Sequence, residues 1–179
     1  QLGYLKLRFM LEQYQQLAAE AAKKNWSHQE YFETLVQGEA DLRWDNSIKR
    51  RIRMARFPVI KTLDQFQWTW PKTINRPQVQ HLFGLDFIDH KANGILLGGV
   101  GLGKTHLATA LGYEACLRGY TVLFSTAVDV INTLSAAQAA GQLKNGLKRY
   151  LKPSLLVLDE LGYLPIDKHG ADLLFQVIS

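Results

Sequence analysis

One short segment carries residues whose types and spacing point to phosphate chemistry. Residues 98–105 read Gly-Gly-Val-Gly-Leu-Gly-Lys-Thr and match the pattern G-x-x-x-x-G-K-[ST], directly after an apolar stretch and directly before a helical one. Glycines let the backbone curl so that its N–H groups face phosphate oxygens, and the start of a helix adds partial positive charge. Lys104 is predicted to reach the β- and γ-phosphates, and the Thr105 hydroxyl to ligate Mg²⁺. We expect nucleotide contacts from Gly98, Gly99, Val100, Gly101, Leu102, Gly103, Lys104, Thr105 and His106.

A second signal is an apolar strand that ends in two acids. Residues 155–160 read Leu-Leu-Val-Leu-Asp-Glu. A buried parallel strand of this kind places both carboxylates at the sheet edge where the phosphate loop also lies. Asp159 is predicted to hold the Mg²⁺ shell and Glu160 to polarise the attacking water, so Glu160 and Lys104 are the predicted catalytic residues. Together the two motifs indicate a Mg²⁺-dependent nucleoside triphosphatase, in which positioning and charge neutralisation supply most of the catalysis.

One alternative at this point is a small-molecule kinase, which would share the glycine loop. The adjacent acids favour hydrolysis, because a water nucleophile needs a base whereas a kinase brings an acceptor hydroxyl. The remaining titratable side chains add little. His106 follows the loop on a helix, where a histidine more often packs or faces solvent than acts, and the other histidines lack metal-ligand spacing. We expect no metal other than Mg²⁺.

Two helices are predicted ahead of these motifs. Apolar residues at steps of three and four predict a first helix over residues 4–23. Ser27 and Glu30 have the spacing of a capping box at the start of a second helix. The second helix continues toward Arg56, with Gly38 as a possible break.

From about residue 81 the pattern changes to short apolar strands that alternate with helices. Alternation of this kind implies right-handed crossovers and an α/β fold with a parallel sheet and helices on both faces. The predicted strands are residues 95–97, 121–125 and 155–159, and the predicted helices are 104–117, 128–137, 142–150 and a last one whose core face carries Ala171, Leu174, Phe175 and Ile178.

The chain is thus expected to have three regions. A small all-helical region over residues 1–58 comes first, followed by a connecting segment over 59–80 and the α/β core over 81–179. Trp68 and Trp70 in the connecting segment are expected to pack on the domain that follows rather than to stack on bases.

Positive charge is concentrated toward the N-terminus of this chain, whose 179 residues carry a net charge of +5. One cluster lies near the end of the second helix. It has two interpretations of equal weight, contact with a polyanion and a solvated helix surface. In this cluster Lys49, Arg53 and Arg56 share a helix face, with Arg50 and Arg51 beside them. The candidates for DNA contact are Lys49, Arg50, Arg53 and Arg56. For a second basic cluster we favour the interpretation of a solvated surface over that of nucleic-acid contact. It consists of Lys144, Lys148, Arg149 and Lys152.

The composition excludes several classes of protein. Hydrophobic residues make up 47% of the chain, which is enough for a packed core and excludes a disordered chain. No apolar stretch approaches the roughly 20 residues that span a bilayer. The single Cys116 and the absence of a charged-then-apolar leader predict a cytoplasmic protein. The chain starts at Gln1 and ends inside a predicted helix, so we expect it to be cut at both ends.

At this point the chain resembles a known family, the IstB branch of AAA+ ATPases, which are helper proteins of certain bacterial insertion sequences. The similarity is carried by the residues 94–105, by Phe124-Ser125-Thr126-Ala127, by Asp159-Glu160-Leu161-Gly162-Tyr163, and by Thr62-Leu63-Asp64-Gln65-Phe66. Together with the N-terminal helices and the basic cluster, it covers nearly the whole chain. DnaC-type helicase loaders share the ATPase core.

The resemblance implies a bacterial cytoplasmic ATPase that forms ATP-dependent homo-oligomers on duplex DNA and recruits or stimulates the transposase of the same insertion sequence. The first helical region would join protomers, and residues 49–56 would contact the DNA backbone. The family's polar sensor and arginine finger would lie beyond Ser179, so this chain is expected to bind ATP better than it hydrolyses it. A helicase loader and a non-catalytic DNA-binding module switched by ATP remain as alternatives.

Overall fold

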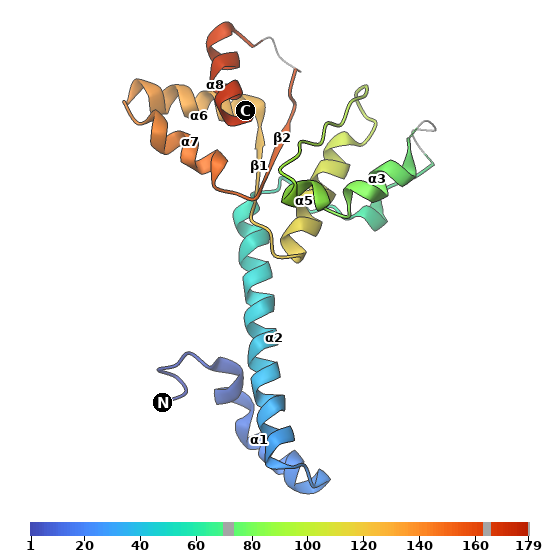
Figure 1. Cartoon of the computed structure of the whole chain (residues 1–179), viewed down its shortest axis with the longest axis vertical. Coiled ribbons are helices and arrows are strands. Elements are labelled where there is room, and N and C mark those ends of the chain that lie inside the picture. The colour runs from blue at the N-terminus through green and yellow to red at the C-terminus, as the bar shows by residue number, and fades with distance from the viewer. Residues whose placement is uncertain (70–73, 163–165, 179) are drawn as a thin grey trace. The chain divides into compact units, whose positions relative to one another are not determined.

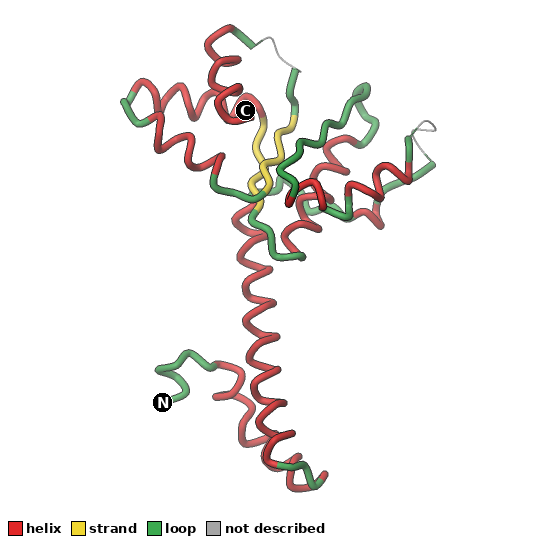
Figure 2. The backbone as a smooth tube through the Cα atoms, viewed as in Figure 1, coloured by secondary structure: helices red, strands yellow, loops and turns green. Residues whose placement is uncertain are grey.

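The computed structural model describes residues 1–69, 74–162 and 166–178 (Figures 1 and 2). The chain divides into two compact units, Gln1–Arg50 and Arg51–Ser179, and each is treated by itself. Three residues named above, Trp70, Tyr163 and Ser179, lie outside the described residues. Within the described part, no helix has the length and apolar character needed to cross a membrane.

The first unit is built from helix α1, Arg8–Lys24, and most of helix α2, His28–Ala55. Helix α1 ends at Lys24 and is capped by Asn25, whose φ of 53° is in the left-handed region. The predicted capping box then starts α2. The Ser27 N–H donates to Oε2 of Glu30 at 2.7 Å, and the Glu30 N–H donates to Oγ of Ser27 at 3.1 Å.

Helix α2 continues through Gly38, where the sequence suggested a possible break. The glycine is needed for packing, because a Cβ at this position would overlap the ring of Phe9. The neighbouring Glu39 is only 5% exposed and caps the start of α1. Its carboxylate accepts hydrogen bonds from the N–H groups of Phe9 at 2.8 Å and Met10 at 3.4 Å. These contacts hold the start of α1 against the middle of α2.

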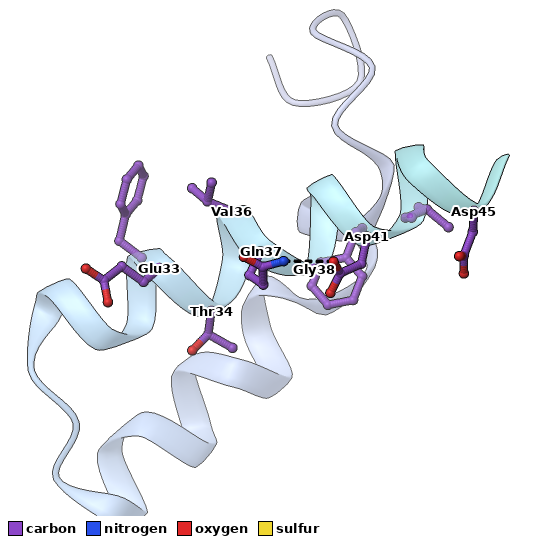
Figure 3. A pocket seen from close by; sticks show the side chains of 10 residues that line it. Glu33, Thr34, Val36, Gln37, Gly38, Asp41 and Asp45 are labelled. Carbon is purple, nitrogen blue, oxygen red and sulfur yellow. Dashed lines mark hydrogen bonds between the residues drawn. The ribbon is translucent and has the colours of Figure 1, made fainter. Parts of the chain in front are cut away.

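A groove of about 960 Å³ opens beside this packing (Figure 3). Its lining includes the acids Glu33, Asp41 and Asp45, and Gln37 donates a hydrogen bond to Asp41 at 2.8 Å. None of the residues that the sequence predicts for nucleotide, metal or DNA contact lines this groove. It therefore does not contribute to the site described below.

The second unit contains a parallel sheet of strand β1, Val122–Thr126, and strand β2, Leu155–Asp159. Their register aligns Val122 with Leu155 at one end and Thr126 with Asp159 at the other. Helices α6, Ala127–Ala139, and α7, Leu143–Leu151, connect the two strands.

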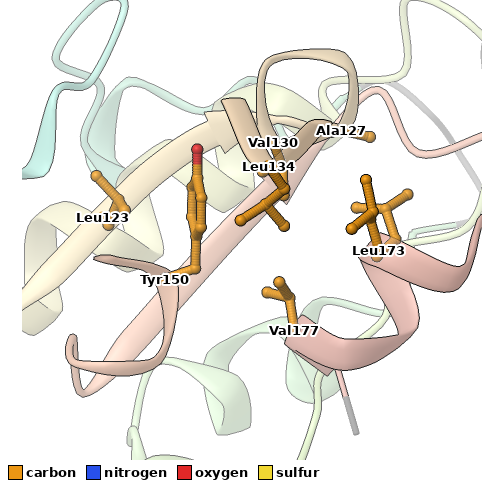
Figure 4. Close-up of a cluster of buried hydrophobic side chains, with 8 residues drawn as sticks. Leu123, Ala127, Val130, Leu134, Tyr150, Leu173 and Val177 are labelled. Atoms are coloured by element: carbon orange, nitrogen blue, oxygen red, sulfur yellow. The ribbon is translucent and has the colours of Figure 1, made fainter. Parts of the chain in front are cut away.

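Alternate side chains of the two strands enter different hydrophobic clusters. Leu123 on one face packs with α6, α7 and the last helix α8, Lys168–Ile178, around the buried Val130 and Leu134 (Figure 4). The opposite face carries Phe124 and packs on helix α5, Lys104–Leu117, through its buried Ala115 and Cys116. The prediction of a parallel sheet with helices on both faces is confirmed.

A third cluster lies at the start of this unit and involves shorter elements. They are the 3₁₀ turn η1, Leu63–Gln65, and the helix α3, Arg76–Leu82. Phe66 and Val79 are buried there against Leu107 of α5. Trp68 packs edge-on against Phe66, a residue of the same connecting segment, with ring centres 5.1 Å apart. The short helix α4, Asp86–Asp89, packs instead on the cluster around Phe124, through Phe87 and Ile88.

Two predictions about this unit are wrong. Residues 95–97 are not a strand: Ile95 and Leu97 are exposed, and among the described residues only β1 and β2 pair as a sheet. In helix α8, of the predicted core residues Ala171, Leu174, Phe175 and Ile178, only Leu174 is buried. Phe175 is 70% exposed, whereas the buried row consists of Gly170, Leu173, Leu174 and Val177. This helix offers two overlapping apolar rows, and packing against α6 selects one of them.

Candidate nucleotide-binding site

The phosphate loop leads into helix α5, which begins at Lys104 as predicted. Gly101 and Gly103 have φ values of 75° and 82°, in the left-handed region that glycine adopts without strain. Within the described chain, the N–H groups of residues 99–106 donate to no backbone or side-chain acceptor, and the first helical bond here joins Leu107 N–H to the Gly103 carbonyl at 2.9 Å. A curled loop with free N–H groups at a helix start fits the phosphates of a nucleotide.

Lys104 lies over this loop. Its Nζ donates to the carbonyl oxygens of Gly98 at 2.8 Å and Gly99 at 2.6 Å. The ammonium group is therefore held at the same backbone curve that carries the free N–H groups. This is the position from which a lysine can meet phosphate oxygens.

The structure uses the imidazole of His106 elsewhere. Its Nε2 donates to the Thr62 carbonyl oxygen at 2.9 Å, and its ring packs edge-on against Phe66 at 5.4 Å between centres. The predicted nucleotide contact of His106 therefore rests on its backbone N–H and not on its side chain. Sequence spacing did not indicate this link, because Thr62 and His106 are 44 residues apart.

The acidic motif lies at the end of strand β2, as predicted. Asp159 is the last residue of the strand, and Glu160 follows it with a φ of 60° and an exposed side chain. In the described part of the chain, neither carboxylate makes a hydrogen bond or an ion pair, and the Thr105 hydroxyl makes none either. These three groups are available to a metal ion and its water, whose preferred ligands are oxygens.

Helix α5 relates the two motifs. It packs on both strands, and it ends where β1 begins: Gly112 approaches Val122, and the Tyr120 N–H donates to the Ala115 carbonyl at 3.0 Å. The helix therefore runs opposite to β1, and its first residue, Lys104, faces the edge where β2 ends at Asp159. No hydrogen bond joins the phosphate loop to Asp159 or Glu160 within the described residues.

The four cations predicted to contact DNA are all exposed. Lys49, Arg50 and Arg53 lie on α2, while Arg56 follows the helix with a φ of 59°. Lys49 and Arg50 belong to the first unit, and Arg53 and Arg56 to the second. The adjacent Arg51 is turned inward and donates through Nε to the Cys116 carbonyl at 3.1 Å.

Other chemistry is sparse in the second unit. The described residues contain no group of three or more His, Cys, Asp or Glu that could hold a metal ion. Cys116 is buried, and this burial raises the pKa of its thiol to about 11, against a smaller lowering by Arg51. A thiol with this pKa is not a nucleophile at neutral pH.

Comparisons with known proteins agree with the geometry. A family model described as IstB-like ATP binding protein matches residues 1–179. The chain is 38% identical to an ATP-binding protein named for insertion sequence IS5376 of Geobacillus stearothermophilus, over 98% of this chain and 70% of that protein. It is 37% identical to the IS21 counterpart from Pseudomonas aeruginosa, over 99% of this chain and 67% of that protein, and 35% identical to the IS232 counterpart from Bacillus thuringiensis, over 99% and 71%. The chain therefore belongs to the family of IstB-like ATP-binding proteins.

Proposed function

We propose that this protein is a Mg²⁺-dependent ATPase that helps DNA transposition in the bacterial cytoplasm. The observation that carries the proposal is the loop of residues 98–103, whose unbonded N–H groups meet the start of α5 beneath the Lys104 ammonium. The second support is the free pair Asp159 and Glu160 at the end of β2. A loop of this kind binds phosphates, and an acid pair at the sheet edge suits a metal ion and a water.

Each of these residues has one task in the proposed reaction. The loop N–H groups and Lys104 bind the phosphates of ATP and hold the γ-phosphoryl group. Thr105 and Asp159 would hold Mg²⁺, and the bound ion would neutralise charge on the phosphates. Glu160 accepts the proton of the water that attacks the γ-phosphorus, and ADP leaves. Most of the rate gain comes from positioning and charge neutralisation.

We infer that ATP binding drives assembly of several copies on duplex DNA, and that this assembly recruits a transposase. Relatives at 35–38% identity are named for insertion sequences, which supports a role in transposition. The exposed cations Lys49, Arg50, Arg53 and Arg56 support contact with phosphates. Contacts to phosphates position a protein on DNA without reading its sequence, which suits a helper with weak target preference.

Sedimentation velocity tests this proposal. The purified chain is run with Mg²⁺ and ATP, and then with ADP, each with and without duplex DNA at two salt concentrations. We expect large complexes only with ATP and DNA together, and fewer of them at high salt. Lys104→Ala should abolish these complexes, while Lys168→Ala, which removes an exposed lysine of α8, should not. Undiminished assembly of Lys104→Ala on DNA would contradict the proposal.

A further inference from the structure

The segment Thr62–Trp68 contacts the phosphate loop, and the proposed reaction does not use it. The ring of Phe66 is 7% exposed and lies on the α-carbon of Gly103, the last residue before α5. A Cβ at Gly103 would lie only 2.7 Å from Cε2 of Phe66 and 3.4 Å from its Cζ. This close approach places an aromatic side chain directly behind the loop.

A second set of contacts holds His106, which follows Lys104 by two residues. The Nε2 of His106 donates to the Thr62 carbonyl at 2.9 Å, and the rings of His106 and Phe66 meet at an angle of 84°. Lys104 lies between Gly103 and His106 in the chain, so the residues on both sides of it are tied to one segment. The start of α5 is thereby fixed in position.

The segment is itself ordered by local bonds. The Thr62 N–H donates to Oε1 of Gln65 at 3.2 Å as part of a capping box, and the Phe66 N–H donates to the Leu63 carbonyl at 3.0 Å. Trp68 packs on Phe66, and the Arg76 guanidinium lies 4.8 Å from the Trp68 ring centre. Phe66 is thus seated on a fixed base when it contacts the loop.

We propose that Phe66 and His106 are positioning residues that hold the phosphate loop in its nucleotide-binding form. The inference rests on the ATP binding proposed above and deepens it. A loop that contains four glycines has few side chains of its own to hold its shape, and ordering it on binding would cost affinity. Contacts that order it beforehand remove that cost.

The test compares two phenylalanines of the same hydrophobic cluster. Phe83 also packs on this cluster, but the three heavy atoms nearest to a Cβ at Gly103 all belong to Phe66. Each substitution, Phe66→Ala or Phe83→Ala, therefore removes one phenylalanine ring from the cluster, and Phe66→Ala removes the ring that lies nearest to Gly103. We measure the Kd of Mg²⁺-ATP by isothermal titration calorimetry and the Tm of each variant. We expect both Tm values to fall, Phe66→Ala to weaken ATP binding at least tenfold, and Phe83→Ala to change it less than twofold.

His106 is tested by a conservative pair. His106→Ala removes the bond to Thr62 and should weaken ATP binding about fivefold. His106→Gln keeps an N–H donor on a side chain of similar length, so it should restore most of the affinity. If the histidine served only to fill space, His106→Gln would not restore the ATP affinity that His106→Ala loses.

A spectroscopic measurement covers the case in which Phe66→Ala does not fold. Trp68 is made the only tryptophan by Trp26→Phe, Trp44→Phe and Trp70→Phe. Because Trp68 touches Phe66 and Phe66 touches the loop, its emission should change when ATP binds. The change should disappear in Phe66→Leu, which keeps an apolar side chain without the ring.

The outcomes separate the two proposals. Two results together would overturn the positioning role and leave the ATPase proposal standing. They are an ATP affinity of Phe66→Ala equal to that of the unsubstituted chain, and an ATP-induced change in Trp68 emission that Phe66→Leu leaves unaltered in the single-tryptophan chain. A chain that binds no ATP before any substitution would overturn both. Equal reductions of affinity in Phe66→Ala and Phe83→Ala would also overturn the inference, because the effect would then belong to the cluster and not to the contact with Gly103.

Discussion

The two halves of the candidate site differ in how firmly the fold holds them. Phe66 lies on Gly103, His106 is bonded to Thr62, and Lys104 is bonded to two loop carbonyls. At the end of β2, by contrast, Asp159 and Glu160 have no hydrogen bond or ion pair within the described part of the chain. The half proposed to bind phosphates is ordered by these contacts, while the half proposed to activate water is held only by its strand. We therefore expect ATP binding and ATP hydrolysis to respond separately to substitution.

The largest expected effect is on hydrolysis alone. Glu160→Gln removes the proposed base and should lower the rate of phosphate release by at least a hundredfold. The Kd for ATP should stay within twofold, because no contact joins Glu160 to the phosphate loop. Glu114→Gln, at a partly exposed site of α5 where the carboxylate pairs with Arg118, is the control and should change neither value. A Glu160→Gln chain that still turned ATP over at the original rate would show that another group activates the water.

The next largest effect is expected in the phosphate loop, the half of the site that Phe66 and His106 hold in place. Gly103→Ala combines a left-handed φ of 82° with a Cβ too close to Phe66, so it should destabilise the chain by about 2–3 kcal/mol and weaken ATP binding at least tenfold. Gly141→Ala is the matched control, because its φ is 68° but no atom lies within 4 Å of its Cβ. This control should be destabilised by only about 1 kcal/mol, with unchanged ATP affinity. Denaturant unfolding and calorimetry measure the two quantities. Equal effects for both glycines would mean that the contact with Phe66 is unimportant.

A third test compares the two basic clusters and asks whether the one outside both halves of the site, at Lys49, Arg50, Arg53 and Arg56, contacts DNA. Replacing Lys49, Arg50, Arg53 and Arg56 with alanine should weaken duplex DNA binding uniformly across sequences. The slope of log K against log salt should flatten by about 0.9 for each DNA phosphate that the protein no longer neutralises. The same four-alanine change at Lys144, Lys148, Arg149 and Lys152 is the control. If the two changes altered the slope equally, the first cluster would have no special role.

The smallest effect contrasts a tightly held acid with the free Glu160. Burial by itself raises the pKa of Glu39, but hydrogen bonds from Arg43 and from the N–H groups of Met10 and Phe9 outweigh it, so that its pKa is lowered from the ordinary value of 4.5. A lowered folded-state pKa gives stability that is present above pH 4.5 and is lost as the pH falls further. Glu39→Gln should therefore lower the Tm at pH 7 and narrow the difference in Tm between pH 7 and pH 4. A difference as wide as that of the unsubstituted chain would contradict the role of this carboxylate.

The parts of the structure that could be predicted are those set by local sequence. The capping box of Ser27 and Glu30, the start of α5 at Lys104 and the strand Leu155–Asp159 each depend on neighbours within a few residues. Strong local signals of this kind need little help from the rest of the chain. The start of α5 and the strand Leu155–Asp159 also carry the proposed chemistry, so both motifs could be recognised before the fold was known.

The parts that could not be predicted depend on distant partners. Residues 95–97 form an apolar triplet, but a strand also needs a neighbour to pair with, and none is present in the described chain. The fit of Phe66 to Gly103 spans 37 residues, and the cap that Glu39 gives to α1 spans 30. In α8 the apolar residues fill two rows, and only tertiary packing decides that Leu173 and Val177 are buried while Phe175 is exposed.

The most direct test of the central claim is calorimetric titration of Mg²⁺-ATP into the unsubstituted chain, Lys104→Ala and Lys168→Ala. We predict one ATP per chain, with equal affinity for the unsubstituted chain and Lys168→Ala. Lys104→Ala should bind at least a hundredfold more weakly, because it removes the ammonium group that lies over the loop carbonyls of Gly98 and Gly99. ATP binding of equal strength by all three proteins would contradict the assignment of residues 98–106 as the nucleotide site.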